Sequence, residues 1–218
     1  MLVHPWDAPA DPAEVVAFLR AQGFGHLIVP GTREVPVVVP TQYVLADDGE
    51  SDLPDVLLHL ARPNPVWAAL AERPTVLLSV AGDWAYVPSS WKAVGDEDPA
   101  LGIPTTYYAA AQLLGDAEVL DDDEAKLDVL RRQLAVLEPD VDHADPSVHR
   151  RRLPGIRAIR IRVREVAGKF KYGGNVDAAH RAAVAANLEA AVGHLRRRSP
   201  DLSAADSAIA QSAADKLA

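Results

Sequence analysis

Hydrophobic and polar positions follow several different periods along this chain, and each period predicts an element. Apolar residues at helical spacing between Asp11 and Gly23 predict an amphipathic helix, because Asp11 can cap its start and Gly23 can end it. Two β-branched runs at 24–29 and 35–45, joined by a Pro-Gly turn, predict a β-hairpin. Further apolar runs predict strands at 56–61, 75–80, 84–87 and 156–166, and a long apolar run covers 107–120. Helices are expected at 64–70, from the acidic residues 121–124 to about 137, and at 177–198.

The order of these elements favours a mainly β domain with peripheral helices, an α+β fold. Many short strands separated by turns, with helices near the edges, are typical of a closed antiparallel sheet rather than a parallel one. Residues 1–198 are expected to form a single domain, since 218 residues allow one substantial core but not two full domains. Residues 199–218, rich in Ser, Ala and Asp, are expected to be a frayed helix or a disordered tail.

Composition removes several classes of function. The chain contains no cysteine, which excludes disulfide frameworks, thiolate metal sites and cysteine nucleophiles. It has no apolar run near the roughly 18 residues of a membrane span and no basic leader at its N-terminus, so a cytoplasmic protein without membrane contact is expected. The formal net charge of -9 argues against an extended nucleic acid footprint, and positive charge gathers only at 150–171 and 196–198.

Four segments carry residue patterns that go beyond secondary structure. They are His59–Trp67 (HLARPNPVW), Ala85–Trp91 (AYVPSSW), Ile103–Tyr108 (IPTTYY) and Lys169–Asn175 (KFKYGGN). Their order and spacing resemble the PaiB-type FMN-binding negative transcriptional regulators, a branch of the FMN-binding split β-barrel superfamily. The resemblance implies a six-stranded-type antiparallel split β-barrel with a C-terminal helix, FMN as cofactor, and a homodimer with its sites at the subunit interface. Contact with nucleic acid is implied by the resemblance alone.

The chain departs from the family pattern at a few positions. Thr106 and Tyr107 stand where the family has Trp and Asn, and Gln112 stands where it usually has His. Gly173 and Gly174 replace a Ser-Gln pair. By the resemblance these positions lie near the flavin, so the departures predict a weakened affinity for FMN or an altered pocket.

The first segment offers groups for a phosphate. FMN requires cationic donors for its phosphate, a flat apolar wall for its ring system and polar groups along the pyrimidine edge. Arg62 has a planar guanidinium that suits the phosphate, and Asn64 has an amide at the start of a short helix. The alternative for Arg62 is a surface ion pair. His59 ends an apolar strand, where a structural role and a functional role are equally expected.

The other segments offer the ring wall and further polar groups. Two aromatic rings and two hydroxyls that suit the ring and the ribityl chain come from Tyr86, Ser89, Ser90 and Trp91. By the resemblance, Thr105 and Tyr108 face the flavin, and the partner subunit contributes Lys169, Lys171 and Asn175. The alternatives are a core role for Trp91 and a solvated strand end for the lysines.

Three functions are compatible with these residues, and whether the chain is an enzyme stays open. The first is a PaiB-type FMN-binding protein, with the flavin as a bound cofactor or redox signal. The second is an FMN-dependent oxidoreductase of the flavin reductase kind, because the cofactor itself carries that chemistry. The third is a flavin-free dimeric relative that binds another planar ligand such as haem. The histidines at 143, 149 and 180 are scattered, and no hydrolase or Walker spacing occurs, so neither a metal site nor a nucleotidase site is expected.

Overall fold

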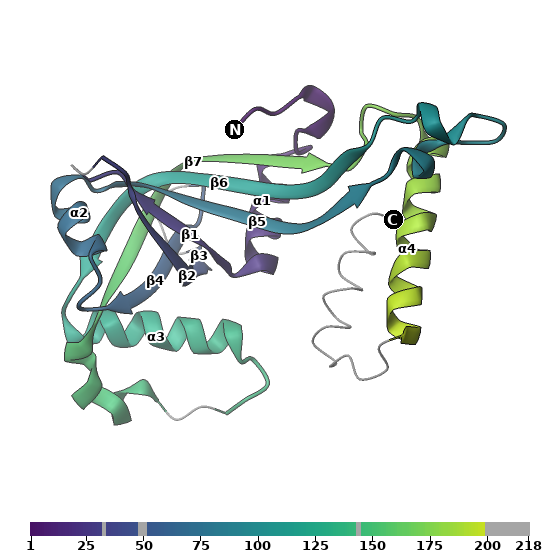
Figure 1. The fold of residues 1–218 in the computed structure, drawn as a ribbon. Helices are drawn as coiled ribbons and strands as arrows, with labels where there is room; N and C mark the ends of the chain where they lie inside the picture. Colours follow the sequence, from purple (N-terminus) through teal and green to yellow (C-terminus); the bar gives the residue numbers. More distant parts are fainter. Residues whose placement is uncertain (32–33, 48–51, 143–144, 199–218) are drawn as a thin grey trace. The chain divides into compact units, whose positions relative to one another are not determined.

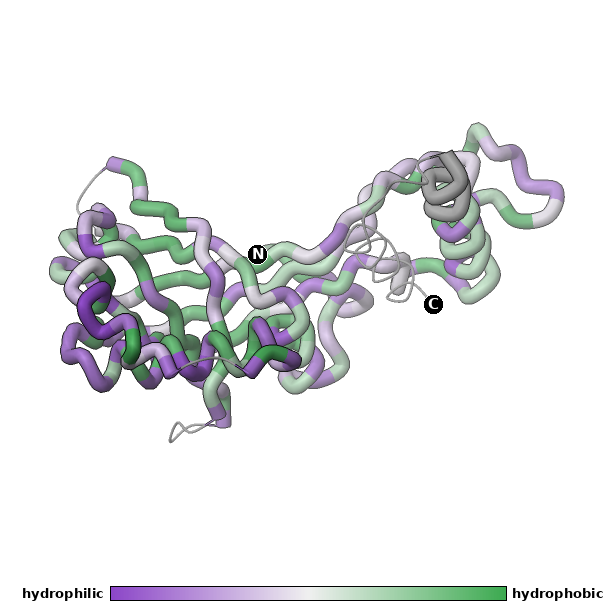
Figure 2. Tube along the Cα trace, turned by 90° about the horizontal axis from the view of Figure 1, so that it is seen from below, coloured by the Kyte–Doolittle hydropathy of each residue, from purple (hydrophilic) through white to green (hydrophobic). Residues whose placement is uncertain are grey.

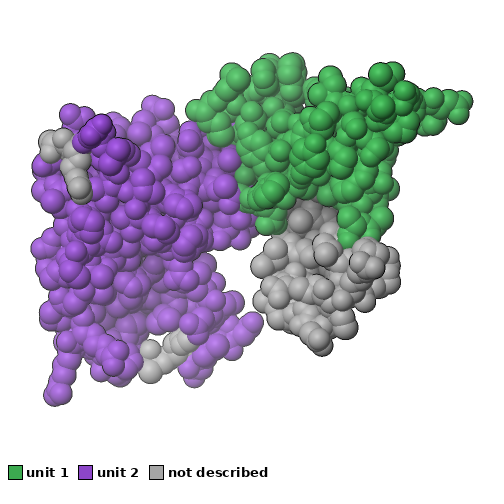
Figure 3. Space-filling view, viewed as in Figure 1, with its two compact units in different colours: residues 1–9, 82–109, 169–218 green, residues 10–81, 110–168 purple. Residues whose placement is uncertain are grey.

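The structure is a computed structural model that describes residues 1–31, 34–47, 52–142 and 145–198, and beyond residue 191 only the backbone of a helix. The chain forms two compact units (Figure 3). Unit 1 comprises Met1–Pro9, Gly82–Ala109 and Lys169–Ala218, and unit 2 comprises Ala10–Ala81 and Ala110–Gly168. The units are discontinuous in sequence because three long strands contribute residues to both. The tail expected at 199–218 lies outside the described residues.

Seven strands form one sheet in the order β2-β1-β5-β6-β7-β4-β3 (Figure 1). They are β1 (Phe24–Val29), β2 (Val37–Gln42), β3 (Val44–Ala46), β4 (Asp55–Ala61), β5 (Thr75–Val87), β6 (Thr105–Leu120) and β7 (Ile156–Lys171). The pairings of β1 with β2 and β5, and of β4 with β3 and β7, are antiparallel. Within unit 2 the sheet curls, as Figure 1 shows. The predicted α+β class with an antiparallel sheet is confirmed.

Two strand boundaries differ from the prediction. The apolar run at 35–45 is divided at Tyr43 into β2 and β3, which adds a short strand. The division has a physical reason, because the buried Tyr43 ring turns inward and its hydroxyl donates to the Leu19 carbonyl oxygen at 2.7 Å. The strands predicted at 75–80 and 84–87 are one continuous strand, so the predicted break between them was wrong.

The described helices lie close to the predicted ranges, and two of them begin at the predicted capping residues. They are α1 (Pro12–Gln22), α2 (Val66–Glu72), α3 (Asp123–Leu137) and α4 (Ala178–Arg198), with 3-10 turns η1 (Pro5–Asp7), η2 (Ser89–Lys92), η3 (Pro99–Leu101) and η4 (Pro146–Gly155). The Asp11 carboxylate accepts from the Glu14 amide at 3.1 Å, and Asp122 accepts from the Ala125 amide at 2.9 Å. These bonds satisfy amide groups that the first turn of a helix leaves without partners.

The core of unit 2 lies between the sheet and its helices. Hydropathy along the chain in Figure 2 shows hydrophobic residues concentrated on the strands. In β1, Leu27 and Val29 are buried while Phe24 and His26 are exposed, as expected for a strand with one buried face. Helix α3 lies against β3, β4 and η4, and one cluster on this side is formed by Val44, Ala46, Leu57, Val129 and Ala158. Burial on both faces therefore makes β4 apolar almost throughout.

Unit 1 has a smaller core. It contains the ends of β5, β6 and β7 that run through 82–87, 105–109 and 169–171, together with η2, η3 and α4. Val87, Tyr107 and Val184 are buried together, and Trp91, Tyr172 and Leu188 pack against them. Helix α4 also contacts η2. Residues from strands, a 3-10 turn and a helix thus share one hydrophobic cluster in this unit.

Candidate functional site

Two lysines of β7 and two residues of β6 meet in unit 1. Lys171 Nζ donates a hydrogen bond to Thr105 Oγ1 at 2.7 Å. Lys169 Nζ lies 5.7 Å from the centre of the Tyr108 ring, which is a cation–π distance. By the resemblance these pairs were expected to reach the flavin from different subunits, whereas the structure brings them together within one chain.

The two lysines differ in how their charge is balanced. Lys169 is buried, donates to the Leu2 carbonyl oxygen at 3.0 Å, and has the buried Asp7 carboxylate 3.8 Å away. Among the described residues, Lys171 contacts a neutral hydroxyl and has no carboxylate partner. The positive charge of Lys171 is therefore available to an anion.

The segment that follows β5 supplies aromatic rings and hydroxyls to the same unit. Tyr86 is 57% exposed, Ser90 is exposed, and Ser89 is half-buried. Trp91 is half-buried and packs against the unit 1 core. Asn175 is exposed just beyond β7. These groups match the chemical types that a flavin requires.

Two departures from the family pattern are coupled through space. Tyr107 is buried, and within the described residues its hydroxyl has no hydrogen-bond partner. A Cβ on Gly173 would lie 2.2 Å from that hydroxyl, and Gly173 has a φ of 78°. A side chain at position 173 is therefore incompatible with the Tyr107 hydroxyl where it lies. Burial raises the pKa of Tyr107, and the nearby Arg181 guanidinium opposes that rise.

Arg181 is a cation of this unit that the motifs did not indicate. It lies in the first turns of α4, and its Nη1 donates to the Val176 carbonyl oxygen at 2.6 Å. Its side chain also approaches Gly173. Because the arginine lies beyond the last family segment, only the helix prediction that begins at 177 could have drawn attention to it.

Arg62 is held by unit 2 groups in this structure. Its Nη2 lies 2.5 Å from Asp121 Oδ1 and its Nη1 lies 3.1 Å from Asp121 Oδ2, while Nε donates to the Pro154 carbonyl oxygen at 2.6 Å. The bidentate pair raises the pKa of Arg62. Arg62 thus forms the ion pair that was its alternative role. The role of Arg62 as a phosphate ligand stays a prediction.

Asp121 joins three cations. Besides Arg62, the buried Lys126 lies 2.9 Å away, and Arg157 Nε lies 3.0 Å away as an ion pair without hydrogen-bond geometry. Hydrogen bonds from Arg62 and then Lys126 hold the pKa of Asp121 far below its usual range. Arg157 also stacks over the Trp67 ring at 5.5 Å. The cluster ties β4, α2, α3 and β7 together.

The other two candidates of the first segment also make contacts within unit 2. His59 Nδ1 lies 2.5 Å from Gln133 Oε1, and Gln133 is buried on α3. The Asn64 side-chain oxygen accepts from the Val66 amide at 3.0 Å, at the start of α2. The Trp67 ring nitrogen donates to the Ala61 carbonyl oxygen at 3.0 Å. These contacts explain the segment as a turn that fixes the β4–α2 connection.

The candidate residues therefore divide between the units. Unit 2 contains His59, Arg62 and Asn64, and unit 1 contains Tyr86, Ser89, Ser90, Trp91, Thr105, Tyr108, Lys169, Lys171 and Asn175. Among the positions of departure, Gln112 is half-buried in unit 2, and Thr106 is half-buried in unit 1. A Cβ on Gly174 would lie 2.1 Å from the Trp6 carbonyl oxygen, which accounts for a glycine there.

Fold and residue pattern place the chain in a class of flavoproteins. Residues 1–165 match the family described as "Putative FMN-binding domain", and the chain belongs to this family, with FMN as the predicted cofactor. The matched region includes the first three resembling segments and ends before the fourth. A relative is "Protease synthase and sporulation protein PAI 2" of Bacillus subtilis (strain 168), which is 26% identical over 172 residues, 74% of this chain and 76% of the relative. The resemblance to the PaiB type is confirmed.

Solved structures share the fold. The flavocytochrome Anf3 of Azotobacter vinelandii is 22% identical, with a TM-score of 0.56 over 77% of this chain and 71% of that chain. The FAD and heme binding protein of Mycobacterium smegmatis is 20% identical, with a TM-score of 0.57 over 79% and 77%. The split β-barrel fold is thereby confirmed. Among the described residues, no helix is both long and apolar enough to span a membrane.

Proposed function

We propose that this chain is a PaiB-type FMN-binding protein that holds the flavin through residues of unit 1. The observation that carries the proposal is the group formed by Lys171, Thr105, Lys169 and Tyr108, which combines positive charge, a hydroxyl and an aromatic ring. Membership of the FMN-binding family supplies the identity of the ligand.

The residues of unit 1 suit each part of FMN. Lys171 and Arg181 contact neutral oxygens, so their charges can attract a phosphate dianion. Tyr86 and Trp91 present ring surface for the isoalloxazine, and Ser90 presents an exposed hydroxyl for the ribityl chain. When bound, FMN supplies hydride and electron transfer, and the side chains bind and orient it.

Arg62 is the weaker candidate for the phosphate. A guanidinium that makes a bidentate pair with a carboxylate must lose that pair before it can grip a phosphate. A phosphate at Arg62 would also lie close to the Asp121 carboxylate, and the two negative charges would repel each other. These costs favour Lys171 over Arg62 as the main cationic contact.

A homodimer belongs to the same proposal. Thr105 and Tyr108 lie beside Lys171 and Lys169 in one chain. In the proposed dimer these residues form the wall that one protomer contributes, and the second copy contributes the other wall. Unit 1 exposes large apolar side chains that an interface would cover, namely Trp84, Tyr86, Leu101 and Ile103. Gene regulation in the cytoplasm is the biological role that the PaiB resemblance suggests, and the net charge of -9 would confine contact with nucleic acid to a local patch.

The test is a titration of FMN with the purified full chain, monitored by the quenching of flavin fluorescence. Absorption near ~450 nm after desalting then measures how much flavin the protein retains. Lys171→Ala should weaken FMN binding by about tenfold, because it removes a charged contact to the phosphate. Lys92→Ala is the matched control, since Lys92 lies in the same unit and donates to the Ile103 carbonyl oxygen. Its effect should stay within about twofold.

Other outcomes separate the alternatives. If Arg62→Ala weakens FMN binding as strongly as Lys171→Ala while the fold stays intact, the phosphate lies at Arg62 and the assignment to unit 1 is wrong. If the chain retains haem but no flavin, the flavin-free alternative replaces the proposal. NADH-dependent reduction of bound FMN would add the oxidoreductase function to a confirmed site.

A further inference from the structure

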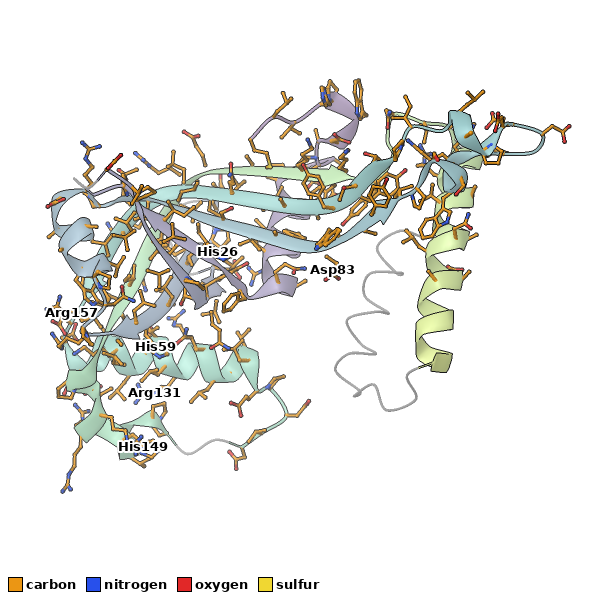
Figure 4. The ribbon with its side chains drawn as sticks, viewed as in Figure 1. His26, His59, Asp83, Arg131, His149 and Arg157 are labelled. Atoms are coloured by element: carbon orange, nitrogen blue, oxygen red, sulfur yellow. The ribbon has the colours of Figure 1, made fainter. Side chains whose placement is uncertain are left out.

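A cavity of about 430 Å³ lies in unit 2 between α3 and η4. It is lined by Leu130, Leu134, Pro146, His149, Arg152, Leu153 and Ile156. The volume falls in the range of about 300–1,000 Å³ that is usual for small-molecule pockets. Figure 4 shows His149 on the segment below α3, with Arg131 on the side of the helix toward it.

The walls of this cavity are mostly aliphatic. Leu130 and Leu134 lie one helical turn apart on α3, and both are half-buried rather than sealed in the core. Leu153 is buried on the opposite wall. The backbone of η4 departs from helical geometry at His149, with φ of -102° and ψ of 19°, which divides this segment into two short turns. An apolar ligand body would therefore replace water against leucine side chains.

The polar groups of the cavity are basic. The cavity is lined by no carboxylate, and within the described residues neither Arg152 nor His149 has an ion pair or a side-chain hydrogen bond. Arg150 and Arg131 are paired, with Glu124 at 2.5 Å and with Asp145 at 3.0 Å. Arg151 is exposed and, among the described residues, has no ion pair either, but it does not line the cavity. In a chain with 31 acidic residues, an arginine without a partner at the edge of an apolar cavity favours an anionic ligand.

We propose that this cavity binds an amphipathic monocarboxylate, with its apolar body against Leu130, Leu134 and Leu153 and its carboxylate at Arg152. Both features are needed, because the leucines supply burial and the guanidinium supplies a bidentate contact for two carboxylate oxygens. The site lies wholly within unit 2 and does not depend on the binding of FMN.

The experiment is calorimetric titration of decanoate, below its micelle concentration, into the full-length protein. One saturable site is expected, and the cationic analogue decyltrimethylammonium should not bind. Arg152→Ala should weaken decanoate binding by about tenfold through loss of a charged contact. The matched control is Arg151→Ala, because Arg151 is exposed, adjacent and outside the cavity. Its effect should stay within about twofold.

A second pair of variants tests the apolar part of the site. Leu134→Trp should fill the cavity and remove decanoate binding, whereas Val136→Trp on the exposed side of α3 should leave it intact. Circular dichroism and thermal melting establish that each variant is folded. The proposal is overturned if the unmodified chain shows no saturable binding, if Arg151→Ala and Arg152→Ala weaken it equally, or if folded Leu134→Trp still binds decanoate.

Discussion

The two units of this protein differ in whether their positive charges are paired with carboxylates. In unit 2 many arginines face carboxylates, as in the pairs Arg62–Asp121, Arg131–Asp145, Arg150–Glu124, Arg162–Glu118 and Arg164–Asp116. In unit 1, Lys92, Lys171 and Arg181 instead donate to neutral oxygens of Ile103, Thr105 and Val176. Unit 2 therefore contains more cations, while unit 1 has more of its positive charge uncompensated.

This difference teaches that the number of cations is a poor guide to an anion site. A paired charge projects a weak field, whereas a cation beside neutral oxygens keeps its attraction for an anion. The run of arginines from 150 to 164 is the most basic stretch of the chain, yet several of its members serve the packing of unit 2. Arg152 is one of the described arginines of unit 2 without an ion pair, and it lines the cavity beside α3.

The largest loss of stability is expected from a substitution at the tightly packed Gly173 of unit 1. Gly173→Ala places a methyl group 2.2 Å from the Tyr107 hydroxyl at a φ of 78°. We expect the free energy of unfolding to fall by about 3 kcal/mol, from overpacking and backbone strain together. Urea denaturation measures it through tryptophan fluorescence, since three of the four tryptophans, Trp6, Trp84 and Trp91, lie in unit 1.

Gly95→Ala separates the two causes of that loss. Gly95 also has a positive φ, 62°, but a Cβ there would meet nothing within 4 Å. Backbone strain alone should cost about 1 kcal/mol. Equal losses for the two variants would mean that the contact between Gly173 and Tyr107 is not what makes unit 1 tight.

The second largest loss of stability is expected from the charge cluster around Asp121 in unit 2. Asp121→Ala leaves the buried Lys126 without its nearest carboxylate, so the free energy of unfolding should fall by about 2 kcal/mol at neutral pH. Sulfate should restore part of the loss, because the freed cations can then bind an anion. The stabilisation by Asp121 is present at neutral pH because its pKa is lowered in the folded protein, and it is lost as pH falls below the ordinary value of 3.8.

The matched control for Asp121→Ala is Asp128→Ala. Asp128 pairs with Arg132 at 2.9 Å on the surface of α3, and such exposed pairs contribute about 0.5 kcal/mol. Thermal melting with and without sulfate compares the two variants. If sulfate stabilises both equally, carboxylates in unit 2 do not mask an anion site, and the contrast between the units fails.

Much of the fold could be predicted because its causes are local. Asp11 and Asp122 indicated helix starts through side chains that reach amides three residues away, and alternation indicated the buried face of β1. The division of 35–45 could not be predicted in this way. It depends on a contact between Tyr43 and Leu19, residues from different elements that no local period connects.

The site was predictable by residue type but not by partner. Lys171 and Thr105 were both expected near the flavin, yet their contact joins residues 66 positions apart. Arg62 has the chemistry of a phosphate ligand. Its carboxylate partner, Asp121, lies 59 residues later in the chain, and only the fold brings the two side chains together. A sequence motif states which groups are present, whereas the fold decides which of them already have partners.

A smaller change in stability is expected when the hydroxyl of one buried tyrosine is removed in each unit. The Tyr107 hydroxyl in unit 1 has no hydrogen-bond partner among the described residues, whereas the Tyr43 hydroxyl in unit 2 donates to Leu19 at 2.7 Å. Tyr107→Phe should therefore leave stability unchanged or raise it by about 0.5 kcal/mol, while Tyr43→Phe should lower it by about 1 kcal/mol. Urea denaturation of both variants gives the comparison. A clear loss with Tyr107→Phe would indicate that its hydroxyl has a partner in solution.

The smallest expected effect is a pH dependence confined to unit 1. His180 Nδ1 lies 2.9 Å from Asp177, and Nε2 lies 3.1 Å from Glu97, which connects α4 to the loop between η2 and η3. Hydrogen bonds to Asp177 and then Glu97 raise the pKa of His180 above the ordinary 6.5.

Because the folded state favours the charged ring, this contact stabilises unit 1 fully below pH 6.5, and the contribution is lost as pH rises through the folded pKa of His180. An NMR titration of the His180 ring proton should give a midpoint above 6.5, and Glu97→Gln should lower that midpoint. Glu165→Gln, a change in unit 2, should leave it where it is. A midpoint that ignores Glu97→Gln would mean that the ring does not contact the loop, and that the pH dependence of unit 1 has another source.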